Sequence, residues 1–261
     1  GRGAATVPED LTQPVDVEVD RVSFAYPGGA PVLENLSVTL RAATTTALVG
    51  TSGAGKSTLA ALIAGLVEPT AGEIRVGGVD TAQVSDLWTA KNVTLLTQDV
   101  HIFAGTLRDD LAMAAPGATD AELLAALAGV GLQPDAVQFA RLFPQGLDTR
   151  VGAGAGDLPP EVEQQLALAR VALAGPKVLI LDEATAEAGS DATNALEEAA
   201  ARITAGTTAL VVAHRLDQAA RADRILVMDA GRIIEDGTHA ELLAAQGRYA
   251  QLFAAWSGNG H

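Results

Sequence analysis

The chain of 261 residues contains no cysteine, so it offers no disulfide, no thiolate nucleophile and no Cys-ligated metal site. Its 17 Lys and Arg against 32 Asp and Glu give a net charge of −15, which opposes nonspecific attraction to a phosphate backbone and argues against a nucleic-acid-binding protein. Hydrophobic residues make up 48% of the chain, and no uncharged apolar run reaches the roughly 20 residues of a membrane span. Composition therefore predicts a globular protein with an aliphatic core.

The first residues predict a tail followed by strands. Residues 1–14 show no periodicity and indicate a linker, and the start Gly1-Arg2-Gly3 has neither a Met nor the apolar core of a signal peptide, so we expect an upstream part to be missing. From Val15, valines alternate with acidic residues up to a turn at 26–29, which predicts a half-buried strand. Alternation at 36–40 predicts a second strand, and 47–49 reads as a short buried one.

The middle of the chain changes from strands to helices. Residues 56–66 should form a helix, 74–78 a hairpin and 93–96 a strand. Thr119 and Glu122 have the spacing of a capping box, and 162–173 carry apolar residues at helical spacing. We therefore expect a helical insert over about 99–174.

The last third returns to alternating strands and helices. Strands are predicted at 178–181, 209–212, 225–228 and 232–234, with a helix near 191–203 and another capping box at Thr238 and Glu241. Such alternation favours an α/β sheet.

One glycine-rich stretch indicates phosphate binding. It matches G-x-x-x-x-G-K-[ST] in full, with the residues Gly50, Thr51, Ser52, Gly53, Ala54, Gly55, Lys56 and Ser57. In such a loop, backbone N–H groups and a helix N-terminus face the phosphates, the lysine neutralises the β and γ oxygens, and the hydroxyl ligates Mg²⁺. The alternative is a glycine-rich turn with an incidental lysine, which the flanking strand and helix disfavour.

A second acidic motif follows the predicted strand at 178–181. Asp182 comes at the carboxyl end of this strand, where it could anchor Mg²⁺. Glu183 is the next residue and could accept a proton from an attacking water. For Glu183 alone, an acidic helix cap is a serious alternative.

Three further residues are candidates for the nucleotide site because of their positions in the sequence. His214 follows the strand at 209–212 and could reach the γ-phosphate, although a lone histidine is more often structural. Gln98 follows another strand and could position water or Mg²⁺, although such a glutamine is most often surface. Tyr26 could stack on adenine, or simply pack.

The order of these motifs resembles the nucleotide-binding domain of the ATP-binding cassette (ABC) family over about 15–252. In that resemblance, Tyr26 lies in the A-loop, Gly50 to Thr58 form the Walker A motif, and Gln98 is the Q-loop. The stretch 178–183 is then the Walker B motif with its catalytic glutamate, and His214 is the H-loop. Residues 98–107 and 146–152 are similar to exporter-type cassettes.

The resemblance implies a fold, cofactors and partners. The fold would be an α/β P-loop NTPase core sheet over about 15–98 and 175–261, with an N-terminal antiparallel β subdomain and a helical subdomain over 99–174. ATP and Mg²⁺ would bind, with Ser57, Gln98 and Asp182 as the metal set. Transmembrane domains would be fused upstream, which places the domain at the cytoplasmic face of a membrane.

The family's Leu-Ser-Gly-Gly-Gln signature is degenerate here. Its place holds the residues Leu158, Pro159, Pro160, Glu161 and Val162. In the family this segment holds the γ-phosphate bound to the opposite subunit through a hydroxyl and backbone N–H groups, whereas proline has neither. Glu161 adds a negative charge that opposes a triphosphate. As a helix start, by contrast, Pro-Pro-Glu is ordinary.

The D-loop also departs from the family, because 186–189 read Ala-Glu-Ala-Gly, and Ala153-Gly154 replace a Glu-Arg pair. In the family, the signature and the D-loop face the partner's nucleotide, so their changes affect the site that the chain would complete for its partner, whereas its own Walker residues are intact. We therefore expect a heterodimer with a different cassette chain. That partner should carry an intact signature and a non-glutamate residue after its Walker B aspartate.

Three other functions are alternatives to an ATP-hydrolysing transporter domain. A nucleotide-gated regulatory cassette that holds ATP without cleaving it is the main alternative, which the prolines favour and Glu183 and His214 oppose. A soluble cassette acting on DNA or ribosomes would need a coiled-coil insert or basic arms. A small-molecule kinase would not explain the set Gln98, Glu183 and His214.

Overall fold

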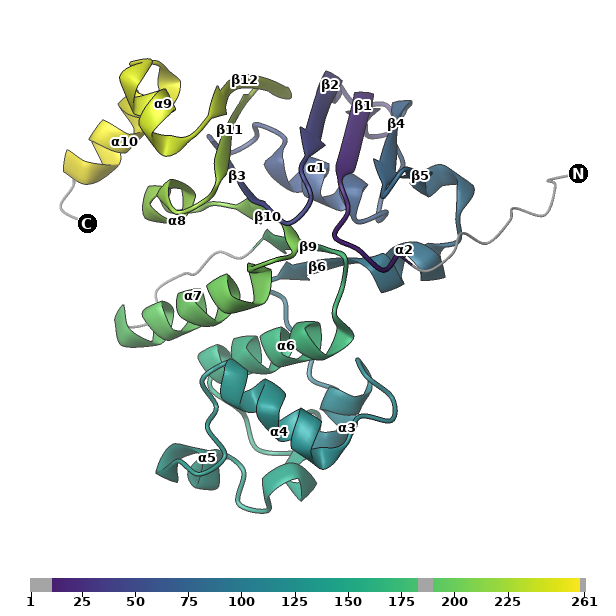
Figure 1. Ribbon diagram of the computed structural model, residues 1–261, viewed down its shortest axis with the longest axis vertical. Helices are drawn as coiled ribbons and strands as arrows, with labels where there is room; N and C mark the ends of the chain where they lie inside the picture. Colours follow the sequence, from purple (N-terminus) through teal and green to yellow (C-terminus); the bar gives the residue numbers. More distant parts are fainter. Residues whose placement is uncertain (1–10, 183–189, 259–261) are drawn as a thin grey trace, which may run out of the picture. The chain divides into compact units, whose positions relative to one another are not determined.

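The computed structural model describes residues 11–182 and 190–258, which form two compact units. The first unit comprises 11–95, 177–182 and 206–258, and the second 96–176 and 190–205. Figure 1 shows that the first unit holds the large sheets and the second the helices α3 to α7. The second unit extends the predicted insert of 99–174 by residues 190–205, because α7 (Ser190–Thr204) packs against α6 (Pro160–Ala174).

A four-stranded antiparallel sheet in the first unit has the order β2-β1-β4-β5. Its strands are β1 (Val17–Ala25), β2 (Pro31–Leu40), β4 (Ala71–Val76) and β5 (Val79–Asp80). Val17 and Val19 are buried in alternation, as are Val22 and Phe24, because strand side chains point to opposite faces in turn; an irregularity between Val19 and Val22 shifts the alternation by one residue. The predicted opening strand and the hairpin around Gly77 are thus confirmed.

A six-stranded sheet of the order β12-β11-β3-β10-β9-β6 carries the site. Its strands are β3 (Thr45–Gly50), β6 (Val93–Thr97), β9 (Val178–Asp182), β10 (Thr208–Val212), β11 (Arg224–Asp229) and β12 (Arg232–Gly237). Strands β11, β3, β10 and β9 run parallel to one another, and β12 is antiparallel. The carboxyl ends of β3, β9 and β10 therefore meet at one edge, where an open α/β sheet binds ligands.

The helices of the first unit begin at signals that the sequence carries. They are α1 (Lys56–Ile63), α2 (Asp86–Asn92), α8 (Leu216–Ala220), α9 (His239–Ala244) and α10 (Arg248–Gly258), with the 3-10 helix η1 (Thr81–Gln83). Thr238 and Glu241 form the predicted capping box of α9. Helix α1 ends three residues before the predicted Leu66, because Gly65 adopts φ +76°.

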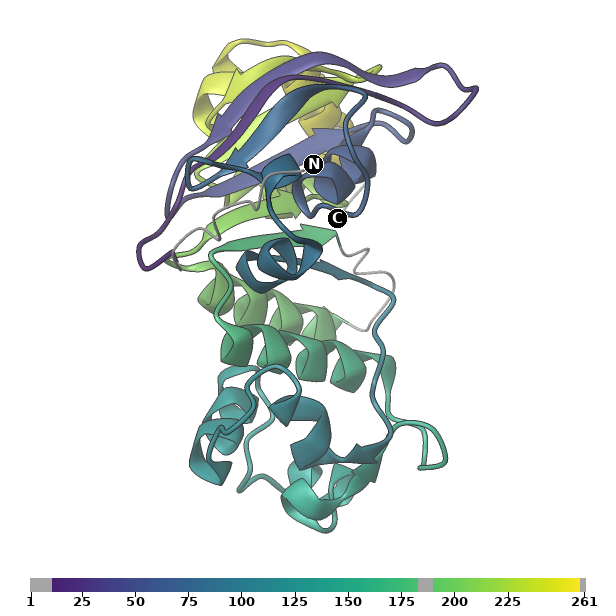
Figure 2. The same cartoon turned by 90° about the vertical axis from the view of Figure 1, so that its right-hand side faces the viewer.

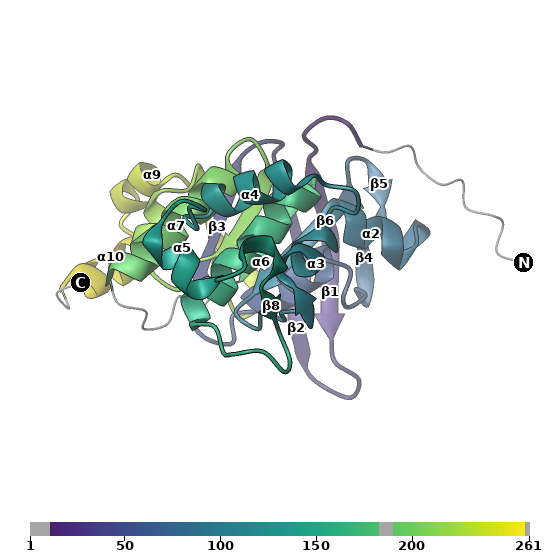
Figure 3. The same ribbon diagram turned by 90° about the horizontal axis from the view of Figure 1, so that it is seen from below.

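The second unit is built around helix α6. Its other elements are β7 (Gly105–Thr106), α3 (Leu107–Ala112), α4 (Asp120–Gly129), α5 (Val137–Leu142), η2 (Gly146–Asp148), β8 (Arg150–Val151) and α7. Helices α3, α4 and α7 pack on α6, as Figures 2 and 3 show from two further sides. The predicted apolar face of α6 is confirmed, since Val162, Leu166 and Ala169 are buried in one core cluster. The capping box of Thr119 and Glu122 is also present.

Within residues 11–182 and 190–258, no helix combines the length and apolarity needed to cross a bilayer.

Candidate functional site

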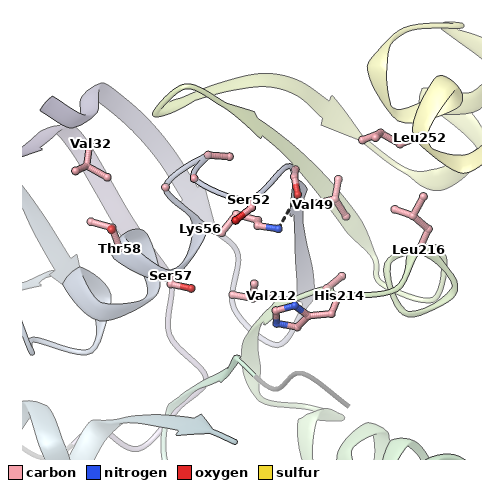
Figure 4. A pocket seen from close by; sticks show the side chains of 15 residues that line it. Val32, Val49, Ser52, Lys56, Ser57, Thr58, Val212, His214, Leu216 and Leu252 are labelled. Atoms are coloured by element: carbon pink, nitrogen blue, oxygen red, sulfur yellow. Dashed lines mark hydrogen bonds between the residues drawn. The ribbon is translucent and has the colours of Figure 1, made fainter. Parts of the chain in front are cut away.

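A pocket of about 510 Å³ lies at the carboxyl edge of the six-stranded sheet (Figure 4). It is lined by Val32, Val49, Gly50, Ser52, Gly53, Ala54, Gly55, Lys56, Ser57, Thr58, Val212, Ala213, His214, Leu216 and Leu252. Every predicted residue from Gly50 to Thr58 except Thr51 is in this lining. The pocket lining is consistent with the prediction that the glycine loop and His214 lie on the same phosphate-binding site.

The loop between β3 and α1 requires glycine at two positions. A Cβ on Gly50 would lie 2.4 Å from the Met228 carbonyl oxygen, and one on Gly55 would lie 2.7 Å from the Leu33 side chain. Gly55 also has φ +101° and is the N-cap of α1 without a side-chain cap. The first N–H groups of α1 therefore have no side-chain acceptor at the cap and remain available to a ligand, which is the geometry of an anion site.

Lys56 is the cation of this loop. Its Nζ donates a hydrogen bond to the Gly50 carbonyl oxygen at 2.7 Å, and Figure 4 shows the side chain extending beneath the loop. Burial lowers the pKa of Lys56 below its ordinary value, and the nearby Asp182 carboxylate partly opposes this shift. An anion bound in the loop would favour the charged ammonium, so the site is suited to phosphate.

Asp182 joins two other predicted residues. The Ser57 hydroxyl at the start of α1 donates a hydrogen bond to Asp182 Oδ2 at 2.9 Å. His214 Nε2 lies 3.2 Å from Asp182 Oδ1, and a carboxylate can only accept, so this nitrogen is the donor. Elements α1, β9 and the end of β10 thus bring together three polar groups that are far apart in the sequence.

The donor set fits Mg²⁺. A hydroxyl and a carboxylate at hydrogen-bonding distance are the two protein ligands typical of this kind of site, where water and phosphate oxygens supply the rest. In the part of the chain that the structure describes, no group of three or more His, Cys, Asp or Glu is placed to hold a metal ion. Of the predicted metal set Ser57, Gln98 and Asp182, the structure places Ser57 and Asp182 within hydrogen-bonding distance of each other.

Tyr26, Gln98 and Asp182 are described by the structure but are not among the residues that line the pocket. Tyr26 is 55% exposed and makes a T-shaped contact with Phe24, with ring centroids 4.9 Å apart, so much of this residue is accessible to a ligand. Gln98 follows β6 and belongs to the second unit, where its backbone oxygen accepts a hydrogen bond from Gln164. Glu183 and the predicted D-loop lie outside the described residues. Their predicted roles stay predictions.

The segment in place of the signature forms the start of α6. Pro159 is the N-cap and makes no side-chain cap, and Pro160 is the first helical residue. The N–H groups of Val162 and Glu163 both donate to the Pro159 carbonyl oxygen, and prolines have no N–H. From Pro159 to Glu163, only the Glu161 N–H is left for an external acceptor, beside its own carboxylate. This helix end therefore offers few N–H donors to an external anion.

Comparisons with known proteins decide the family. The family model described as ABC transporter matches residues 33–186, which is more than half of the chain. The chain belongs to the ABC transporter family. The predicted P-loop fold and ATPase class are thereby confirmed for this ABC domain.

Two curated relatives and one solved structure illustrate the likeness. The mycobactin import ATP-binding/permease protein IrtA of Mycobacterium tuberculosis is 41% identical over 97% of this chain and 29% of that protein. IrtB of the same organism is 40% identical over 91% of this chain and 40% of that protein. The structure of a bacterial Atm1-family ABC exporter with ATP bound matches with a TM-score of 0.85 at 32% identity, over 97% of this chain and 43% of that one. The chain thus spans less than half the length of each.

Sequence reasoning missed some of the residues that shape this ABC domain's site. Leu216 and Leu252 line the pocket from α8 and α10, and no sequence pattern distinguishes them from ordinary core residues.

Asp110 in α3 is also a residue that the sequence analysis did not single out. It is fully buried, and the sequence contains a pattern that predicts this burial. It lies three residues after Leu107 and one before Leu111, both fully buried, so helical spacing places it on the apolar face.

Proposed function

We propose that this domain binds ATP with Mg²⁺ in the pocket at the sheet edge and hydrolyses it. The observation that carries the proposal is the meeting of Ser57, Asp182 and His214 beside a glycine loop that holds Lys56. A strand end with only a structural role does not need a half-buried lysine with a lowered pKa, as Lys56 is. Nor does it need a histidine and a hydroxyl that form hydrogen bonds with the same carboxylate, as His214 and Ser57 do with Asp182.

Each residue has a proposed part in this reaction. The N–H groups of the loop and Lys56 bind and neutralise the phosphates, and Tyr26 stacks on the adenine. Ser57, Asp182 and Gln98 hold Mg²⁺, which would supply positive charge to the phosphate oxygens. His214 donates a hydrogen bond toward the γ-phosphate, and Glu183 accepts the proton of the attacking water.

We also propose that the chain works with a different cassette. Support comes from the start of α6, where Pro159 and Pro160 lack N–H groups and Glu161 contributes a negative charge to the first turn. Two unit charges 4 Å apart repel by about 1 kcal/mol in water and by about 4 kcal/mol at an effective dielectric of 20. A partner with an intact signature would complete the competent site here, and the partner's own site would turn over poorly.

The energy of hydrolysis would drive transport. The relatives named above are ATP-binding/permease proteins, and the Atm1-family match is an exporter chain, so we propose transmembrane domains fused upstream of this domain. The domain would then lie at the cytoplasmic face of the membrane. IrtA and IrtB are mycobactin import proteins, and the transported compound of the present protein would be decided by its membrane domains.

Substitution of the proposed base tests hydrolysis. We expect Glu183→Gln to lower steady-state ATP hydrolysis of the complex with its partner by about a hundredfold or more while ATP still binds, because general-base catalysis typically contributes 10² to 10⁴. Asp182 would remain to hold the metal. An unchanged rate would reject hydrolysis at this site and favour a regulatory cassette that only holds ATP.

A further inference from the structure

The segment 98–104 is held in place by side chains rather than by secondary structure. It lies between β6 and β7 and contains neither helix nor strand. Arg170 Nη1 donates to the His101 carbonyl oxygen at 2.9 Å, and the Phe103 N–H donates to Asp110 Oδ1 at 3.0 Å. At the beginning of the segment, Gln164 Nε2 donates to the Gln98 carbonyl oxygen at 3.3 Å. Three points of this irregular backbone are therefore fixed from α3 and α6, all within the second unit.

Asp110 and Arg170 form the centre of this arrangement. Asp110 is fully buried, and its Oδ1 accepts from both Phe103 N–H and Arg170 Nη1, the latter at 2.8 Å. Among the described residues, Asp110 Oδ2 has no hydrogen-bond partner, so the charge is compensated through Oδ1 alone. The Arg170 guanidinium also lies 5.8 Å from the centre of the Phe103 ring. Removing one partner would leave the other charge without an opposite charge to compensate it in the interior.

Stability alone does not explain an ion pair at this position. A well-packed apolar pair of similar volume is often as stable as a buried ion pair or more so. What an apolar pair cannot do is hold the backbone carbonyl of His101 and the backbone N–H of Phe103 at fixed points. The contacts of Asp110 and Arg170 with main-chain atoms therefore indicate a role in setting the course of the segment.

We propose that Asp110 and Arg170 are positioning residues that fix the segment 98–104 to α6 and thereby set the place of Gln98. Gln164 and Arg170 belong to the same helix that starts with Pro159 and Pro160. Gln98 and the start of α6 would then move as one body. The proposal rests on the role given to Gln98 above, and it adds two residues, neither of which touches substrate or metal.

Asp110→Ala, Asp110→Asn and the matched control Leu111→Ala test this proposal. Leu111 is the next residue on α3 and is also fully buried, but its side chain makes no hydrogen bond to the segment. The first measurement is hydrogen exchange of the Phe103 amide in the full chain. We expect Asp110→Ala to accelerate exchange about tenfold more than Leu111→Ala, because only Asp110→Ala removes the charged acceptor of the Phe103 N–H. Asp110→Asn keeps an acceptor and should recover part of the protection.

The second measurement is steady-state ATP hydrolysis by the complex with its partner. Asp110→Ala should lower kcat about tenfold and leave KM for ATP within about twofold, since nucleotide contacts are intact. Asp110→Asn should lie between, and Leu111→Ala should keep kcat. Equal effects of Asp110→Ala and Leu111→Ala on exchange and kcat would overturn the proposal. If Asp110→Ala fails to fold, Asp110→Asn and Arg170→Lys decide, and unchanged exchange and kcat in both would overturn it.

Gln98→Ala separates this proposal from the one on which it rests. A loss of hydrolysis in Gln98→Ala supports the role of Gln98. If Gln98→Ala hydrolyses ATP at the normal rate, the role given to Gln98 is wrong, and the claim that Asp110 sets its place for catalysis falls with it. Faster Phe103 exchange in Asp110→Ala with normal kcat, while Gln98→Ala is inactive, would overturn the positioning proposal alone.

Discussion

The Ser57 hydroxyl donates a hydrogen bond to Asp182 Oδ2 at 2.9 Å, which joins the start of α1 to the end of β9. These two oxygens are the protein ligands that the proposed Mg²⁺ site needs. Substitution of either residue should therefore weaken Mg²⁺-dependent nucleotide binding more than it lowers the stability of the fold.

Asp182→Asn should weaken Mg²⁺-dependent ATP binding at least tenfold. Replacing partners outside the first coordination shell already costs about tenfold to a hundredfold in metal affinity, and a lost carboxylate ligand should cost no less. The measurement is ATP affinity with Mg²⁺ and with a chelator. Asp229→Asn is the control, because Asp229 also ends a strand of this sheet but lies against Arg248, whereas Asp182 accepts a hydrogen bond from Ser57. Equal affinities of Asp182→Asn and Asp229→Asn would contradict the assignment.

Lys56 should make ATP binding sensitive to alkaline pH. Burial lowers its pKa in the free protein, so Lys56 loses its proton at a lower pH than an ordinary lysine, and the neutral amine cannot neutralise phosphate. ATP affinity should therefore fall as the pH rises toward that pKa, and binding there should take up a proton. Titration of affinity against pH checks this. Lys56→Arg should give a flat profile, and a similar fall in that variant would exclude Lys56 as the cause.

Tyr249 should make folding stability fall above about pH 10. Its side chain is fully buried and bonded to His239 Nδ1 at 2.6 Å, and burial raises the pKa of the phenol from 10.0 to about 12. A group whose folded pKa is raised contributes stability that is complete below the unfolded pKa and is lost as the pH passes from about 10 to about 12. Denaturant unfolding at several pH values measures this loss.

Tyr26→Phe provides the control for that experiment, because the chain has 2 tyrosines and Tyr26 is the exposed one. Tyr249→Phe should be less stable at neutral pH, since it loses the bond to His239, but its stability should change less between pH 10 and 12. A steep loss of stability in Tyr249→Phe over that range would contradict the prediction.

Restoring the signature should create activity in the chain by itself. The triple substitution of Pro159→Ser, Pro160→Gly and Glu161→Gly returns a hydroxyl and N–H donors and removes the carboxylate at the start of α6. Because one donor to a transition-state oxyanion can be worth 10² to 10³ in kcat, we expect ATP hydrolysis by the chain alone to rise about tenfold or more. Glu163→Gly, in the same helix turn, is the control and should give no such rise.

Local sequence signals predicted much of this fold. The capping boxes at Thr119 and Thr238 and the alternation in β1 depend on residues close together in the chain, and all of them are present in the structure. The glycine loop was equally predictable, since its positive φ angles demand glycine. These features need no knowledge of which segments meet in space.

Long-range packing set the limits of prediction. The assignment of α7 to the second unit depends on its contact with α6, which the order of elements does not reveal. The sequence did predict that Asp182 and His214 lie at the same edge of the sheet, because each comes at the carboxyl end of a buried strand and parallel strands end at one edge. Their common hydrogen bond, and the grip of Asp110 and Arg170 on the segment 98–104, depend on side-chain geometry that no sequence pattern supplies.

We propose that this chain brings the hydrolytic groups for its own ATP, whereas the start of its α6 cannot complete a second site. The most direct measurement is steady-state ATP hydrolysis by the purified chain over a range of its own concentration, before and after addition of the partner cassette. We expect a low rate of hydrolysis that does not rise with the concentration of the chain, and a higher rate once the partner is added. Fast, cooperative hydrolysis by the chain alone would contradict this proposal if substitutions at Pro159, Pro160 and Glu161 left the rate unchanged.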